Sequence, residues 1–345
     1  MTLRAEDIAA YRSPVVNRDD LGRGGDGQQD GVLFIAPDHN TDDLLYPNAS
    51  ASPIGWWSGL PRVLLGARNL FRAISDCGTV HIETASGSSF ARQAAPALIL
   101  GRFLGKRTIL SYSDNNAPTR LARAGWWMTP LMRLCDKIVV STNFLATMLA
   151  GHGVTTEVRL PAVDDELFQP REIHSVQPRI IVARSLEARN NIACALEALR
   201  LVKQKYPRTE MVVAGDGSLR GQLSDLVAAK GIHGVSFAGR LNLTELAAQL
   251  SQVDLYVNAS TIDCLPYSLP AALTIGLPVV TTPAGGISEM VVDGVNGLMV
   301  RPNDPVGLAD RIIRLVESPA LVSRLCEQAK LSAAMFHQPR LRDGQ

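Results

Sequence analysis

The residues whose chemistry is easiest to name are two arginines in the stretch "ARSLEARNN". Arg184 directly follows an apolar run, and Arg189 comes five residues later at the entrance to an expected helix. Guanidinium groups grip phosphate oxygens, and the free amides at a helix start add positive potential. The pair therefore predicts an anion site. The alternative is a solvated basic loop.

A glycine-containing turn follows the next apolar run, in "VVAGDGSLRGQL". Gly215 and Gly217 precede an expected helix and would allow tight turning and close approach of the backbone to a ligand. With Gly221 as the third glycine, the spacing is one residue off the dinucleotide GxGxxG pattern. Taken alone, the stretch is better explained as a plain turn between a strand and a helix.

An acid and a short helix stand together in "DCLPYSLPAALTIGLPVVTT", which begins at Asp263. Ser268 is expected to cap a helix of about two turns that ends at Gly276. Asp263 lies on the preceding loop, placed to accept hydrogen bonds from sugar hydroxyls, although an ordinary Asp in a turn is the alternative. Gly285 and Gly286 follow the next strand and would either admit a ligand to backbone amides or only shape a loop.

Several other kinds of site are not indicated. The six histidines lack metal spacing, and no Asp-x-Asp pair is available to hold a divalent cation on a diphosphate, so we expect no metal. The sequence also lacks a GxSxG elbow and a P-loop. Hydride transfer, serine-hydrolase and kinase chemistry all lose support.

The composition is that of a globular protein with two domains. The 345 residues are 46% hydrophobic and 19% charged, and the net charge of +1 gives no reason to expect a nucleic-acid partner. Five scattered cysteines without CxxC spacing suit a reducing compartment. Because the sequence contains neither a signal peptide nor an apolar run of about 18 residues, we expect a cytoplasmic protein.

Alternating apolar runs and helical periodicity predict the elements that must position these residues. Residues 1–30 are expected to be a mobile leader, 31–165 an N-terminal Rossmann-like domain, 166–178 a linker, 179–330 a second Rossmann-like domain and 331–345 a tail. Expected strands in the first domain are 32–36, 79–83, 107–112, 137–141 and 156–161, with helices at 60–74 and 88–104 and a Trp-rich helical stretch.

The second domain restarts the same pattern. Expected strands are 178–183, 210–214, 235–239, 255–259, 278–282 and 297–300, and the first helix carries an apolar stripe at Ile192, Ala195, Leu196, Leu199 and Val202. The fold class is therefore α/β, with two doubly wound parallel sheets. Since ligands bind beyond the carboxyl ends of parallel strands, the arginine, glycine and Asp263 loops are expected at one edge of this sheet.

In this order, the pieces of the second domain resemble the donor-binding domain of retaining, GT-B fold glycosyltransferases of family four. The similar stretches are "ARSLEARNN", "VVAGDGSLR", "VSFAGR", "DLYVNASTIDCLPYSLPAALTIGLPVVTTPAGGISEMVVDGVNGLMV" and "LADRIIRLVESP". The first domain is similar more loosely, through "SGLPRVLLGARNLFRAI" and "CDKIVVSTNFLATMLAGHG". The resemblance implies two domains facing a cleft, with the donor in the second and the acceptor in the first.

The resemblance also implies residue roles. Arg184 and Arg189 would bind the donor diphosphate, and Asp263 the donor sugar. The remaining donor-binding positions would be Gly215, Gly239, Arg240, Leu265, Pro266, Tyr267, Ser268, Leu269 and Ala271, with helix amides at 268 and 269 on the phosphates and the loop at 239 and 240 beside the nucleobase. On the acceptor side the matching positions are Gly59, Ser113 and Asp114, where Asp114 would orient an acceptor hydroxyl.

One family position is altered. The family carries two glutamates eight residues apart, and here they are Asp263 and Ala271. Losing a charged partner to a ligand hydroxyl costs about 1.5–3 kcal/mol, or roughly 10 to 150-fold in affinity. A glutamate at 271 would also complete a capping box with Ser268. Weakened donor binding is therefore expected, without loss of activity being implied.

The expected function is transfer of a sugar, with retention and without a metal or other cofactor, from a nucleotide-diphosphate sugar to a saccharide or lipid-linked acceptor. The alternative is a catalytically weak or inactive GT-B protein that serves as a nucleotide-binding or partner scaffold. A nucleotide-sugar epimerase fits the residues less well. The stretch "RAGWWMTPLMRL", 123–134, suits either a peripheral contact with the inner face of an anionic membrane or a helix core with solvated arginines.

Overall fold

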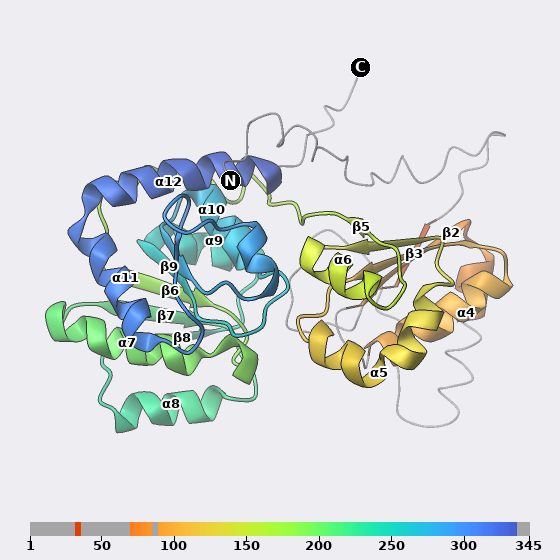
Figure 1. Ribbon diagram of the computed structural model, residues 1–345, viewed down its shortest axis with the longest axis horizontal. Coiled ribbons are helices and arrows are strands. Elements are labelled where there is room, and N and C mark those ends of the chain that lie inside the picture. The colour runs from red at the N-terminus through yellow and green to blue at the C-terminus, as the bar shows by residue number, and fades with distance from the viewer. Residues whose placement is uncertain (1–31, 36–69, 85–88, 337–345) are drawn as a thin grey trace, which may run out of the picture. The chain divides into compact units, whose positions relative to one another are not determined.

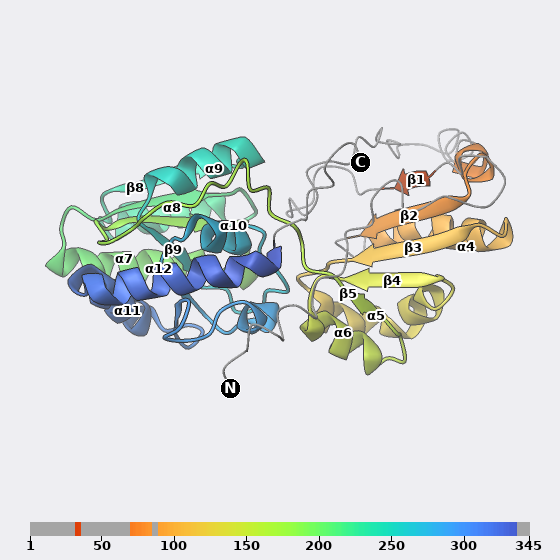
Figure 2. The same ribbon diagram turned by 90° about the horizontal axis from the view of Figure 1, so that it is seen from above.

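The computed structural model describes residues 32–35, 70–84 and 89–336, and the expected leader and Gly59 lie outside them. The chain divides into two compact units, Met1–Leu160 and Pro161–Gln345. Each unit contains one parallel sheet with helices packed on it, as Figures 1 and 2 show. The prediction of two parallel α/β domains is confirmed.

In the first unit the strands follow one another across the sheet in chain order. They are β1 (Val32–Ile35), β2 (Thr79–Thr84), β3 (Arg107–Tyr112), β4 (Lys137–Val140) and β5 (Glu157–Val158). After β2 the chain forms a π-helical turn η2 (Phe90–Ala94), and the helices are α4 (Ala95–Phe103), α5 (Ala117–Met132) and α6 (Asn143–Ala150). These three helices lie on one side of the sheet (Figure 1).

A glycine in α4 and a capping threonine before α6 position these two helices in the layer. A Cβ added at Gly101 of α4 would lie 2.9 Å from the Thr108 methyl group, so glycine permits the close approach of α4 to β3. The side chain of Thr142 accepts a hydrogen bond from the Leu145 N–H at 3.3 Å and so begins α6.

The second unit has six parallel strands. They are β6 (Arg179–Ala183), β7 (Glu210–Ala214), β8 (Val235–Gly239), β9 (Leu255–Asn258), β10 (Val279–Thr281) and β11 (Leu298–Met299), in the order β11-β10-β9-β6-β7-β8. The helices are α7 (Ile192–Lys205), α8 (Arg220–Ala229), α9 (Leu243–Gln252), α10 (Ser268–Ile275), α11 (Pro305–Glu317) and α12 (Pro319–Ala333). Short 3-10 turns are η3 (Ala188–Asn190), η4 (Gly285–Glu289) and η5 (Ala334–Phe336).

This strand order has a topological switch point. From β6 the chain builds outward through β7 and β8, and then returns to add β9, β10 and β11 on the other edge. The loops that follow β6 and β9 therefore leave the sheet in opposite directions, which is where open parallel sheets bind their ligands. Residues after Ala183 and after Asn258 form these two loops.

Apolar periodicity predicted the packing of α7 correctly. Its expected stripe is fully or almost fully buried at every position, namely Ile192, Ala195, Leu196, Leu199 and Val202. The same face contacts α11. Burial of this stripe is what holds α7, and hence the arginine loop before it, on the sheet.

The expected capping role of Ser268 is wrong. Helix α10 begins at Ser268 itself, and Tyr267 before it is helical and makes no capping bond. The Ser268 hydroxyl instead donates to the Ala183 carbonyl at 2.8 Å and contacts the Tyr256 hydroxyl at 2.8 Å. Because every residue of α10 is buried, its first turn is fastened to β6 rather than capped. A glutamate at 271 would therefore not complete a capping box. Gly276, with φ of 84°, ends the helix as predicted.

The stretch expected to link the domains lies within the second unit. Phe168 is fully buried, and the Arg171 guanidinium donates to the carbonyls of Ser251 and Val253. Residues 331–336, expected in the tail, complete α12 and η5. The Phe336 carbonyl accepts from the Val163 N–H at 3.0 Å. Isolated apolar anchors in an aperiodic stretch leave no pattern by which to predict this packing.

All five cysteines are free thiols. In the part of the chain that the structure describes, no helix is long and apolar enough to cross a membrane.

Candidate anion-binding site

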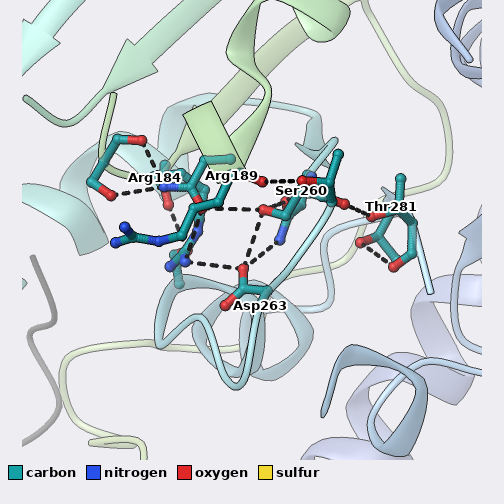
Figure 3. Close-up of polar contacts among 12 residues, drawn as sticks. Arg184, Arg189, Ser260, Asp263 and Thr281 are labelled. Atoms are coloured by element: carbon teal, nitrogen blue, oxygen red, sulfur yellow. Dashed lines mark hydrogen bonds and ion pairs between the residues drawn. The ribbon is translucent and has the colours of Figure 1, made fainter. Parts of the chain in front are cut away.

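The loops that follow β6 and β9 bring Arg184 and Asp263 together at the switch point (Figure 3). Arg184 is the first residue after β6, and its Nη2 lies 3.0 Å from Oδ2 of Asp263. The Arg184 side chain is 6% exposed and that of Asp263 is 0% exposed. The predicted cation and the predicted acid are therefore direct partners, in an environment that excludes water.

The two oxygens of Asp263 have different surroundings. Oδ2 also accepts hydrogen bonds from the Ser260 hydroxyl at 3.2 Å and the Asn258 amide at 3.5 Å. Oδ1 points away from this network in Figure 3 and has no partner among the described residues. Burial raises the pKa of Asp263, and the Arg184 guanidinium opposes that rise. Oδ2 therefore pairs with the Arg184 guanidinium, whereas Oδ1 accepts no hydrogen bond from the described residues.

A buried asparagine holds the arginine loop in shape. Asn190 is fully buried, and its amide donates to the carbonyl and hydroxyl of Ser185, both at 2.7 Å. Its Oδ1 accepts from Arg184 at 3.3 Å and from the Ser260 hydroxyl at 3.4 Å. Arg184 is thus oriented from its own loop as well as from the loop after β9.

Arg189 supplies the second cation. It lies in η3, is partly exposed, and its side chain runs beside that of Arg184 (Figure 3). Its carbonyl accepts from the Thr261 N–H at 2.7 Å and the Thr261 hydroxyl at 3.0 Å, which ties the two loops together. Arg189 thus places a second guanidinium group beside Arg184, and paired guanidinium groups are suited to binding a phosphate or another anion.

The glycine turn after β7 supports the arginine loop directly. At Gly215, whose φ is 143°, an added Cβ would lie 2.0 Å from the Arg184 carbonyl oxygen. At Gly217 it would lie 2.8 Å from the Leu186 carbonyl oxygen. The close approach expected toward a ligand is therefore made by the neighbouring loop. Glu187 fastens the contact, because its carboxylate accepts from the N–H and the hydroxyl of Ser218, both at 2.8 Å.

The loop after β10 completes the cluster. The Gly286 N–H donates to the Asp263 carbonyl at 3.0 Å, and the Thr282 hydroxyl donates to the Ser260 carbonyl at 2.5 Å. The glycine pair at 285 and 286 therefore shapes the acid loop. The connections after three neighbouring strands of the sheet, β10, β9 and β6, build one hydrogen-bonded site.

The predicted donor-binding residues of the α10 region are all buried, namely Leu265, Pro266, Tyr267, Ser268, Leu269 and Ala271. Tyr267 packs edge-on against Phe168, with ring centroids 6.2 Å apart, and burial raises its pKa to about 12. The Leu269 N–H donates to the Pro266 carbonyl at 3.0 Å. A phosphate at this helix start would have to share that amide.

Two predicted residues lie apart from the cluster. Gly239 ends β8, the edge strand two positions from β6, and Arg240 after it is exposed. At about 4.8 Å between neighbouring strands, this end lies about 10 Å from that of β6. Gly239 still contributes, because its carbonyl accepts from the Gly215 N–H at 2.7 Å.

Asp114, predicted to orient an acceptor hydroxyl, is bonded to neighbouring residues of its own unit. Asp114 is buried, pairs with Arg120, and accepts from the Asn116 N–H at 2.8 Å. These bonds stabilise the start of α5. Ser113 is partly exposed, and its N–H donates to the Thr84 carbonyl at 3.0 Å. Gly59 lies outside the described residues.

Three partners in this network were missed from sequence. They are Asn190, Asn258 and Ser260, each fully buried. Asn258 and Ser260 interrupt an otherwise apolar strand end, which is the signal that could have identified them. No group of three or more His, Cys, Asp or Glu side chains in the described ranges could hold a metal ion.

Comparison with known proteins agrees with this geometry. Residues 163–332 match the family model described as Glycosyl transferases group 1. The chain is 29% identical over 166 residues to glycogen synthase of Mycobacterium tuberculosis H37Rv. The aligned stretch covers 47% of this chain and only 40% of that protein. It is 27% identical over 313 residues to the MMP alpha-(1->4)-mannosyltransferase of Mycolicibacterium hassiacum, covering 81% of this chain and 72% of that protein.

Solved structures extend the likeness to both units. Anabaena Alr3699/HepE, in complex with UDP and glucose, has a TM-score of 0.69 at 17% identity, covering 82% of this chain and 80% of that one. Sucrose-phosphate synthase from Thermosynechococcus elongatus has a TM-score of 0.65 at 17% identity, covering 89% and 84%. The chain has the GT-B fold. The glycosyl transferases group 1 model matches residues of its second unit, and the arginine cluster lies within the matched stretch.

Proposed function

We propose that this GT-B protein is a retaining glycosyltransferase of family four. It would move a sugar from a nucleotide-diphosphate sugar to a hydroxyl of a saccharide or lipid-linked acceptor, without a metal. The observation that carries the proposal is the pair Arg184 and Arg189, two cations at the switch point of a glycosyl transferases group 1 domain. The names of its relatives and the UDP-glucose complex of HepE support the same chemistry.

In the proposed mechanism the two arginines stabilise the negative charge that develops on the leaving diphosphate. Asp263 holds Arg184 through Oδ2 and offers Oδ1 to a hydroxyl of the donor sugar, whose anomeric centre becomes cationic. The acceptor hydroxyl attacks from the face that the diphosphate leaves, so configuration is retained. The fixed hydrogen bonds of Asn190 and Ser260 orient the cation before the donor arrives.

The test compares cations at the two ends of β6. Arg184→Ala and Arg189→Ala are expected to weaken binding of UDP and other nucleoside diphosphates by at least about tenfold, measured by calorimetry, because each loses a charge-assisted bond worth about 1.5–3 kcal/mol. Arg179→Ala, at the amino end of the same strand, is the matched control. Binding unchanged in both Arg184 and Arg189 variants would refute the site.

Turnover is tested separately. The chain is incubated with a panel of nucleotide sugars and candidate acceptors, and products are identified by mass spectrometry. Transfer or donor hydrolysis that is lost in the Arg189→Ala variant supports the transferase. Tight nucleoside diphosphate binding without either product would support the alternative of a nucleotide-binding scaffold, in which Ala271 leaves the site one acid short.

A further inference from the structure

The outward face of the helical layer in the first unit carries large apolar side chains. On α4, Ile99 and Phe103 are 52% and 82% exposed, and on α5 Trp126 is 81% exposed. Helices α4 and α5 contact each other on the same side of the sheet (Figure 1). Large apolar side chains that lie together in contact with water mark a candidate interaction surface.

Cations are interleaved with these apolar residues. Arg102 lies beside Phe103 on α4, and Arg123 lies one turn before Trp126 on α5. Both arginines are exposed, as are Arg107 and Arg133. Residues at spacing i, i+3 and i+4 share a helix face, so each helix presents a mixed apolar and cationic stripe.

Acids are nearly absent from the same stretch. Residues 89–135 contain seven Lys and Arg residues and one acid, Asp114. Asp114 is buried and already paired with Arg120, so it does not neutralise the outer face. The whole chain has a net charge of only +1, which makes this concentration of positive charge local to one helical layer.

We infer that the outward face of α4 and α5 docks on an anionic phospholipid bilayer. The arginines would contact lipid phosphates, while Phe103, Trp126 and Ile99 would enter the boundary between headgroups and acyl chains. A soluble polyanion would use the cations but would leave three large apolar side chains in water. The inference does not depend on the proposed transferase activity, and it concerns the first unit alone.

The test measures sedimentation of the full chain with vesicles. Vesicles of equimolar phosphatidylcholine and phosphatidylglycerol are expected to bind the protein, and phosphatidylcholine alone to bind it much less. Arg102→Gln with Arg123→Gln should weaken binding roughly 25-fold, since each basic residue near an anionic surface contributes about fivefold. Phe103→Ser with Trp126→Ser should weaken it by about tenfold or more.

Matched controls come from the second unit. Val306→Ser with Leu331→Ser removes apolar side chains of 58% and 60% exposure, and Arg208→Gln with Arg324→Gln removes two exposed cations. Neither pair should change vesicle binding. The inference is overturned if the wild type shows no preference for anionic vesicles, or if the apolar pair binds them as the wild type does. A third outcome would also overturn it. If the Arg102→Gln, Arg123→Gln variant lost binding to vesicles and to double-stranded DNA equally, and the Phe103→Ser, Trp126→Ser variant lost neither, the face would bind a soluble polyanion instead.

UDP binding, measured on the same vesicle-binding variants, keeps the two proposals apart. These variants should bind nucleoside diphosphates as the wild type does, because none of the changed residues belongs to the Arg184 cluster.

Discussion

The two units of this protein hold their arginines in opposite environments. In the second unit Arg184 is 6% exposed and lies against a fully buried carboxylate, and Asn190 and Ser260 make further hydrogen bonds to this pair. In the first unit Arg102 and Arg123 are exposed on helices beside Phe103 and Trp126. A buried charge needs a prepared partner, whereas an exposed one costs little and is available to a large external surface. Changes in the first case should cost folding free energy, and in the second only binding.

The largest expected effect follows from breaking the buried pair. Arg184→Met leaves the buried Asp263 without the cation it pairs with, and should lower the free energy of unfolding by about 3–5 kcal/mol. Arg179→Met breaks the pair with Asp254, in which the arginine side chain is 49% exposed, and should cost about 1 kcal/mol or less. Urea denaturation measures both. Combining Arg184→Met with Asp263→Asn should recover part of the loss. Equal costs for the two single variants would remove the distinction between buried and exposed arginine pairs.

A change at Ala271, where the family resemblance implies a glutamate, tests the proposed contact with the donor ribose. Ala271→Glu is expected to raise affinity for the nucleotide sugar by roughly 10 to 150-fold, through a charged hydrogen bond worth about 1.5–3 kcal/mol. Ala272→Glu is the control, since that residue is equally buried but points from a different side of α10. Both variants should lose stability, so calorimetric affinity is the deciding measurement. No gain for Ala271→Glu over Ala272→Glu would speak against a ribose contact there.

Glu83 in the first unit differs from Asp263 in what shifts its pKa. Burial is the cause for Glu83, whereas a nearby arginine also acts on Asp263. Burial raises the pKa of Glu83 from 4.5 to about 7. The folded state therefore favours the protonated form, and its stability falls as pH rises from about 4.5 to about 7. Glu83→Gln should stabilise the protein at pH 8 by about 1–3 kcal/mol and have little effect near pH 4, as followed by urea denaturation at each pH.

The pKa of Glu157, in the same unit, is shifted in the opposite direction from that of Glu83. Burial alone would raise its pKa, but the hydrogen bonds and charges of Lys137 and Arg159 together lower it, so the charged form is favoured in the folded protein. Glu157→Gln should give no stabilisation at pH 8. The assignment for Glu83 is refuted if both variants respond to pH in the same way.

The smallest expected effect is on the exposed layer. Arg102→Gln with Arg123→Gln should change the free energy of unfolding by less than about 0.5 kcal/mol, because neither side chain is buried. Thermal unfolding without vesicles measures this. A loss as large as that of Arg184→Met would mean that these arginines stabilise the fold and would weaken the contrast drawn above.

The elements were largely predictable from local patterns. Strand β6 was expected at 178–183 and spans Arg179–Ala183, and the apolar stripe of α7 is buried at each expected position. These features depend on periodicity within a few residues. The meeting of Arg184 and Asp263 could be expected from the rule that ligands bind at strand ends, together with the family resemblance.

The details of the site were not predictable in the same way. Asn190 and Ser260 are common polar residues whose importance comes from a contact between loops far apart in the sequence. For Gly215 the sequence favoured a plain turn and the resemblance implied a ligand contact, but neither indicated that an added Cβ would meet the Arg184 carbonyl. Ser268 was expected to cap α10, but its hydroxyl is used by Ala183. Each outcome depends on which strands are neighbours, and strand order is not encoded in local periodicity.

The position of β6 at the switch point also bears on how the chain is made. Its first neighbour, β7, follows after one helix, but its second neighbour, β9, is synthesised only after β8 and α9. Until Leu255 and Tyr256 emerge to pair with Ile180 and Ile181, one edge of an apolar strand has unpaired backbone groups. Such an edge can pair with another chain. The free edge of β6 is therefore open to such pairing from the time β6 emerges until β9 follows it.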